Sequence, residues 1–129
     1  MVARDCQRTF LRMAGVGDYR KLRVWEAADK VTLAVYQETQ GFPTSEQFGL
    51  RSQMRRAAVS VPSNIAEWCG RNTLPQLRQF ARIALGSANE LEYQIGLAGR
   101  LGFLVPQVAD RLAGEVGEVK RMLAGLLHR

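Results

Sequence analysis

The sequence predicts an all-α protein, an up-down-up-down antiparallel four-helix bundle. Four segments repeat apolar residues at spacings of three and four, which is typical of amphipathic helices, and no segment shows the alternation of a strand. The connections between these segments are short, so consecutive helices must run antiparallel. The 129 residues correspond to one domain, which buries about two-thirds of its extended-chain surface on folding.

The first predicted helix extends from about Leu22 to Gln40. Gly41 and Pro43 end it, because glycine favours a helix C-terminus and proline cannot continue the hydrogen-bond pattern. One face of this helix carries an apolar stripe of Val24, Trp25, Ala28, Val31, Thr32, Val35 and Tyr36. We expect this face to lie in the core.

The second predicted helix begins after Pro43, where the Thr44 or Ser45 side chain can cap it, and ends at Gly70. Its seam consists of Met54, Ala58, Val61, Ile65 and Trp68, at spacings of four and three. The seam keeps its phase on both sides of Pro62. We therefore expect one helix kinked at Pro62 rather than two helices.

The third predicted helix begins with a capping box, in which the Thr73 hydroxyl accepts from the amide of Gln76 and Pro75 occupies the first turn. Gly99 and Gly102 bracket its end. Its apolar residues are Leu77, Phe80, Ala84, Ala88, Leu91, Ile95 and Ala98.

The fourth predicted helix begins at Pro106 and extends toward Arg129. Its stripe consists of Val108, Leu112, Val116, Val119, Leu123 and Leu126. We therefore expect a bundle domain over residues 18–129, preceded by a poorly ordered basic N-terminal arm over residues 1–17. The arm carries Arg4, Arg8 and Arg12 at a spacing of four.

Several classes of protein are disfavoured by what the chain lacks. No apolar stretch is long enough to span a membrane. The two cysteines, Cys6 and Cys69, do not indicate a disulfide framework, so the expected location is the cytoplasm and Cys69 is expected to be a buried, inert thiol. The single histidine, His128, argues against a histidine metal site or a Ser-His-Asp arrangement. We expect no cofactor and no catalysis.

Additional apolar residues lie outside the main seams, at Leu33, Phe48, Leu50, Val59, Ile83, Leu85 and Leu97. Monomers rarely leave large contiguous apolar patches exposed, so these residues predict self-association. The alternative is that they are single surface hydrophobes, which are common in monomers.

Six arginines and one acid, Glu67, lie between positions 51 and 82, and this stretch has no lysine. A guanidinium group binds phosphate through two hydrogen bonds, so an elongated strip of such groups suits a nucleic acid. The candidate binding residues are Arg51, Arg55, Arg56, Arg71, Arg78 and Arg82. The alternative is a solvated face whose arginines pair between molecules with acids such as Glu26, Asp29 or Glu38.

Polar residues surround Pro62 in the segment from Ser60 to Glu67, which also holds Ser63 and Asn64. They form either a polar contact site or the partners of backbone carbonyls that the proline leaves free, and we favour the second interpretation. Few aromatic residues are expected on the basic face, so we do not expect sequence-specific base stacking.

The sequence strongly resembles a family of bacterial four-helix bundle proteins encoded in intervening sequences of 23S ribosomal RNA genes. The accessory variability determinant of diversity-generating retroelements is in the same group. The resemblance extends from about Asp18 to Leu127 and rests most specifically on the stretches RRAAVSVPSNIAE and ALGSANELE. The chain departs from the usual pattern at Trp68, where such proteins have glycine after the Ala-Glu pair, and in its additional N-terminal segment.

The resemblance implies a bundle that assembles into a homopentamer with a basic surface. For the retroelement member it implies binding to nucleic acid and to a reverse transcriptase. Together with the arginines, this favours an oligomeric, non-catalytic accessory protein that binds nucleic acid, with RNA as the expected ligand. The alternative is a protein-interaction scaffold, for example for a reverse transcriptase, with no direct role in nucleic-acid binding.

Overall fold

The computed structural model describes residues 18–71 and 73–127, and within these ranges it contains four long α-helices and no strand. A short 3₁₀ turn precedes the first long helix, and a second one lies before the next. In chain order the elements are η1 (Tyr19–Lys21), α2 (Arg23–Glu38), η2 (Thr44–Glu46), α3 (Leu50–Trp68), α4 (Leu74–Arg100) and α5 (Pro106–Leu127).

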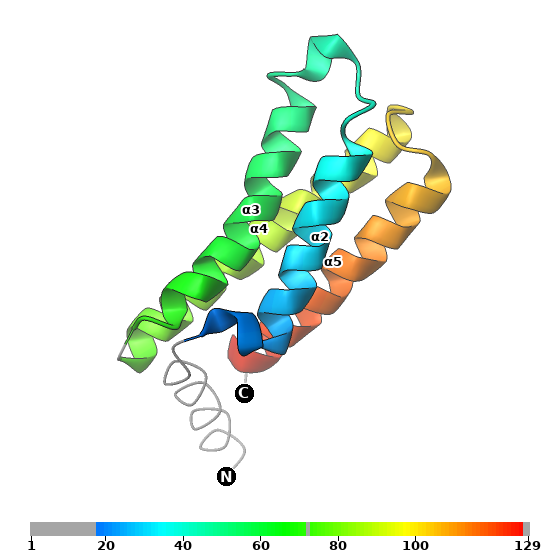
Figure 1. The fold of residues 1–129 in the computed structure, drawn as a ribbon. Coiled ribbons are helices and arrows are strands. Elements are labelled where there is room, and N and C mark those ends of the chain that lie inside the picture. Colours follow the sequence, from blue (N-terminus) through cyan, green and yellow to red (C-terminus); the bar gives the residue numbers. More distant parts are fainter. Residues whose placement is uncertain (1–17, 72, 128–129) are drawn as a thin grey trace.

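The four α-helices form an antiparallel bundle in which each helix packs against the next one along the chain (Figure 1). Helix α2 also packs against α5, which closes the ring of helices. The connections after α2 and α4 lie at the upper end in Figure 1, where the rings of Phe42 and Phe103 pack 5.4 Å apart. The α3–α4 turn lies at the lower end, with the start of α2 and the end of α5. The predicted up-down-up-down bundle is confirmed.

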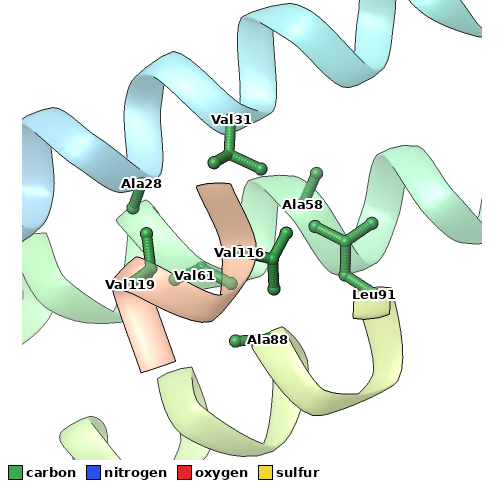
Figure 2. A pocket seen from close by; sticks show the side chains of 8 residues that line it. All are labelled: Ala28, Val31, Ala58, Val61, Ala88, Leu91, Val116 and Val119. Carbon is green, nitrogen blue, oxygen red and sulfur yellow. The ribbon is translucent and has the colours of Figure 1, made fainter. Parts of the chain in front are cut away.

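The predicted seams form the core of this bundle. All five seam residues of α3 are buried, and so are those of α4 apart from the half-buried Phe80. At the centre each helix contributes two apolar side chains that point toward one another (Figure 2). These are Ala28, Val31, Ala58, Val61, Ala88, Leu91, Val116 and Val119. The space left between them is about 10 Å³ and is lined by apolar side chains that offer a water molecule no hydrogen-bond partner, so the centre is closely packed.

Helix α3 continues through Pro62 as one helix, as the phase of its seam predicts. Proline has no amide hydrogen, so the carbonyl of Ala58, four residues earlier, loses its intrahelical donor. The Thr32 hydroxyl of α2 lies 3.0 Å from that carbonyl oxygen and 2.9 Å from the carbonyl oxygen of Ala28 in its own helix. The free carbonyl is therefore satisfied from the neighbouring helix. The sequence-based interpretation, in which polar residues between Ser60 and Glu67 satisfy the freed carbonyl, is therefore wrong for Ala58.

Two predicted helix starts differ from the structure. Thr44 and Ser45 do not cap α3, because they lie in η2, and α3 begins only at Leu50. The Glu46 carboxylate instead accepts from the Leu50 amide at 3.3 Å. Thr73 is the N-cap residue of α4, as predicted, but its side chain makes no capping hydrogen bond. The capping box is therefore absent, while Pro75 lies in the first turn as expected.

The last turn of α3 is anchored in the core by Trp68, which is completely buried. Cys69 follows it and is buried as well, and its thiol lies 3.7 Å from the carbonyl oxygen of Ile65. Burial raises the pKa of the Cys69 thiol above its ordinary value, so the neutral form is favoured. This agrees with the predicted buried, inert thiol.

The apolar residues outside the seams have different environments. Leu50 is buried and belongs to the core, so the expectation that it is spare surface was wrong; it lies in the first turn of α3, where it packs inward. Leu85 and Leu97 are half-buried against the core. The other four residues are exposed, namely Leu33, Phe48, Val59 and Ile83.

None of the helices in the described ranges is both long enough and apolar enough to cross a bilayer. The predicted arm over residues 1–17 lies outside the described residues, as does the expected spacing of its arginines.

Candidate nucleic-acid interface

The six candidate arginines form two groups at opposite ends of the α3–α4 hairpin. Arg51, Arg55 and Arg56 lie in the first turns of α3, at the upper end of the bundle in Figure 1. Arg71 lies in the α3–α4 turn at the lower end. Helix α3 separates Arg51 from the turn that holds Arg71 by about 25 Å along its axis, at 1.5 Å per residue from Arg51 to Trp68.

Arg55 is held against the end of α2. Its Nε donates to the Thr39 hydroxyl at 2.9 Å, and one terminal nitrogen donates to the Tyr36 carbonyl at 3.1 Å. Its guanidinium carbon also lies 4.6 Å from the centre of the Tyr36 ring. The positive charge therefore meets the partly negative carboxyl end of α2, a favourable arrangement that fixes the side chain.

Arg51 and Arg56 border the same surface hollow as Arg55 but have no carboxylate partner among the described residues. The hollow measures about 360 Å³. We call it the Phe48 groove, and its lining residues are Tyr36, Gln47, Phe48, Arg51, Ser52, Arg55 and Arg56. The Phe48 side chain is 88% exposed and Tyr36 is 40% exposed, so two aromatic rings accompany three guanidinium groups. None of these described lining residues is acidic.

The position of this arginine group at the start of α3 strengthens its attraction for anions. A helix N-terminus carries a partial positive charge and unpaired amide groups. The first turn of α3 contains no acid, and Glu46, which precedes it, accepts from the Leu50 amide. Arginines at this end of a helix reduce its stability, whereas they add to the positive potential of the groove.

The lower group is partly engaged with the protein. Arg71 donates to the Glu67 carboxylate at 3.0 Å and lies 4.9 Å from the centre of the Phe80 ring. Arg78 is half-buried, and its Nε is covered without a hydrogen-bond partner. Arg82 is exposed and makes no ion pair within the described part of the chain.

Helix geometry shows that the two groups do not share one face. Ser87 marks the α3 side of α4, because its hydroxyl lies 2.7 Å from that of Ser60. Arg78 precedes Ser87 by nine residues, which is half a turn away around the helix. Arg78 therefore points toward the α5 side of the hairpin, whereas Arg55 points toward α2. The structure thus shows two separated basic regions in place of the expected strip.

In the alternative interpretation, the arginines of one molecule pair with acids of another, such as Glu26, Asp29 or Glu38. Within the described part of one chain, Glu38 pairs with Arg111 of α5 at 3.2 Å, and Glu67 is the only acid that pairs with one of the six. Five of the six arginines consequently have no carboxylate partner there.

A polar groove of about 520 Å³ separates the exposed edges of α3 and α4. It contains the Ser60–Ser87 hydrogen bond, and Asn64 donates to the Ser60 carbonyl at 2.7 Å. Arg56 and Glu90 also line this groove. The Ser60–Ser87 contact links α3 to α4, whereas the Asn64 contact stays within α3. Neither reaches the Ala58 carbonyl, so these side chains support the helices in a different way from the one predicted.

Among the described residues, no three His, Cys, Asp or Glu side chains are grouped so that they could hold a metal ion.

Sequence reasoning did not identify Tyr36 or Phe48 as part of the site. Tyr36 belongs to the stripe predicted to lie in the core, but it is exposed, because it lies at the edge of α2 against Arg55. Phe48 is predicted only to be an apolar residue outside the seams. The order Phe-Gly-Leu-Arg at positions 48–51 could have indicated this part of the site, because it places an aromatic residue three positions before an arginine at the start of a helix.

Comparison with known proteins agrees with this fold. The chain resembles a crystal structure of a protein with unknown function from the S23 ribosomal protein family of Bacteroides thetaiotaomicron, with 19% sequence identity and a TM-score of 0.75. The match covers 82% of this chain and 99% of that one. No curated protein matches the chain. The model of the 23S rRNA-intervening sequence proteins matches residues 20–125. The chain therefore belongs to the family of 23S rRNA-intervening sequence proteins.

Proposed function

We propose that this protein is a non-catalytic, oligomeric accessory protein of the cytoplasm that binds nucleic acid, with RNA as the ligand, through the arginines of α3 and α4. One observation carries the proposal: five of the six arginines have no carboxylate partner within the described residues. Guanidinium groups left without acids are available to phosphate, to which they bind through paired hydrogen bonds.

The net charge of the chain supports this proposal. Eighteen Lys and Arg residues against twelve Asp and Glu give +6, and the segment from Arg51 to Arg82 contains six arginines and one acid. Such an excess attracts a polyanion over distances comparable to the screening length, about 8 Å at physiological salt.

Assembly is the second part of the proposal. Tyr93 of α4 and Leu33 of α2 expose most of their side chains, and Ile83 is also exposed on α4. We propose that copies of the chain cover these residues, and the homopentamer implied by the resemblance is the form we test. Five copies would carry about +30, five times +6. Light scattering should then give five times 14.4 kDa.

The binding proposal is tested with a variant that removes exposed charge without removing known contacts. Arg56→Glu/Arg82→Glu is suitable because both residues are exposed. Arg55 is less suitable, since its contacts with Tyr36 and Thr39 hold α3 to α2. The matched control is Arg23→Glu/Lys30→Glu, which makes the same change in charge at exposed positions of α2.

Fluorescence anisotropy with a labelled RNA stem-loop, at about 50 and 200 mM salt, gives the affinity and its salt dependence. We expect Arg56→Glu/Arg82→Glu to lower the affinity and to reduce the salt slope by about 2, one unit for each lost phosphate contact. The control should retain most of the binding. The proposal is wrong if the wild-type protein does not bind at low salt, or if both variants lose affinity equally.

The alternative function is a protein-interaction scaffold, for example for a reverse transcriptase. The exposed Tyr93 and Leu33 favour it, because such side chains suit protein contacts. The same variant separates the two functions. Loss of assembly in Arg56→Glu/Arg82→Glu would favour the scaffold, whereas loss of RNA binding with assembly intact favours the nucleic-acid function.

A further inference from the structure

We propose that the Phe48 groove binds single-stranded RNA, with an unpaired base stacked on the Phe48 ring and the neighbouring arginines holding the flanking phosphates. This inference rests on the proposed function and specifies its ligand. It also departs from the sequence-based expectation that the basic face has few aromatic residues and does not stack bases.

Phe48 is the most exposed large apolar residue in the described part of the chain, at 88%. It lies in the turn between η2 and α3, directly before Gly49, the N-cap residue of α3. Covering apolar surface is favourable in proportion to the area removed from water. A flat base can cover a phenyl ring of this kind, and stacking on aromatic side chains is the usual way in which proteins hold unpaired bases.

The charges around Phe48 match a nucleic-acid backbone. Arg51, Arg55 and Arg56 line the same groove, and no acid among the residues that the structure describes lines it. Arg55 is already fixed by its hydrogen bonds to Thr39 and Tyr36, so one wall of the groove needs little ordering when a ligand binds. An apolar partner helix would leave these three guanidinium groups without counter-charges, and desolvating them would be costly.

The same geometry favours a single strand over a duplex. In an RNA duplex the flat faces of the bases are stacked on one another inside the helix, so the exposed Phe48 ring could reach phosphates, sugars and base edges but no base face. An unpaired base in a loop or bulge can turn outward onto the ring. Duplex binding should therefore depend on the arginines alone, and single-strand binding should depend on both the arginines and Phe48.

The test compares Phe48→Ala with Phe48→Trp, and uses Val105→Ala, between α4 and α5, as the control for loss of an exposed apolar side chain. Anisotropy is measured with a short single-stranded RNA and with a duplex of the same sequence. We expect Phe48→Ala to weaken single-strand binding by about 5- to 100-fold and to leave duplex binding within about twofold. Phe48→Trp should retain binding, and a base stacked on the introduced indole should quench its fluorescence.

The possible outcomes distinguish failure of the proposed function from failure of the inference that a base stacks on Phe48. If the wild-type protein binds neither RNA, the proposed function itself fails. If it binds both and Phe48→Ala binds the single strand as wild type does, only the stacking inference fails. If a polyglutamate peptide displaces the single strand from wild type and Phe48→Ala equally, the groove recognises charge alone. If Phe48→Ala changes the mass in light scattering, a second protein chain covers Phe48 and the inference is wrong.

Discussion

Replacing Thr32 by valine should destabilise the bundle because Pro62 lies in the neighbouring helix. Valine has nearly the same shape as threonine but has no hydroxyl, so the Ala58 carbonyl would lose the donor now 3.0 Å away. The Ala28 carbonyl, the other acceptor of this hydroxyl, keeps the backbone amide of residue 32 as its own helical donor. The cost therefore arises mainly at Ala58.

The magnitude follows from leaving one carbonyl unpaired. An unsatisfied buried acceptor costs about 1–3 kcal/mol, and the half-buried position of Thr32 places the expected loss near the lower end, about 1–2 kcal/mol. For a chain of this length the melting temperature should fall by about 4 °C for each kcal/mol. Thr32→Ser, which keeps the hydroxyl, should recover most of the stability.

A double-mutant cycle with Pro62→Ala tests the reasoning directly. Alanine restores an amide hydrogen at position 62, so the Ala58 carbonyl regains its helical donor. Thr32→Val should then cost less than about 0.5 kcal/mol, which gives a coupling free energy of about 1 kcal/mol. The measurement is urea unfolding followed by circular dichroism at one fixed protein concentration, because assembly would shift the apparent stability. An equal cost of Thr32→Val in both backgrounds would refute the assigned role of Thr32.

Three further outcomes are expected. Leu91→Ala, at the closely packed centre, should lower the unfolding free energy by about 2–5 kcal/mol in urea titrations, whereas Leu101→Ala, at an exposed position, should change it by less than about 0.5 kcal/mol. Gly102→Ala should destabilise the protein by about 1–2 kcal/mol, because Gly102 has a φ of 78°, which alanine rarely adopts. Gly86→Ala should stabilise it by up to about 1 kcal/mol, because an added methyl group meets nothing within 4 Å in α4. Melting temperatures that shift in opposite directions in the two variants would support this. Because burial raises the pKa of the Cys69 thiol above the ordinary value of 9.0, the folded protein should react slowly with a thiol reagent at neutral pH. The stability that the neutral thiol contributes should be present below pH 9 and should decline as the pH rises through the raised pKa. Rapid labelling of Cys69 in the folded protein at neutral pH would contradict this.

The core of the bundle was predictable because a helix repeats every 3.6 residues, and burial follows that period. The seam of α3 from Met54 to Trp68 could therefore be identified without knowledge of its neighbours. The start of α3 was not predictable from capping preference alone, because Thr44 and Ser45 form a separate 3₁₀ turn and the Glu46 side chain serves the helix instead.

The candidate site was less predictable, because its geometry depends on how the helices are rotated relative to one another. Sequence identifies Arg55 as a basic residue on α3, but its partners Thr39 and Tyr36 lie on a different segment and meet it only after packing. The opposite directions of Arg55 and Arg78 depend on the same rotations. The exposure of Phe48 depends on the path of the turn before α3, which periodicity does not describe.

Both ends of the described chain lie at the pole of the bundle opposite Phe48. Leu22 and Leu126 line one shared hollow at the lower end, whereas the Phe48 groove is at the upper end. A dye or affinity tag attached near Leu127 would thus be about 30 Å from the groove, the length of about 20 helical residues. The same proximity of the ends makes the bundle suitable for circular permutation, with a linker joining α5 to α2 and new termini opened in the connection after α4.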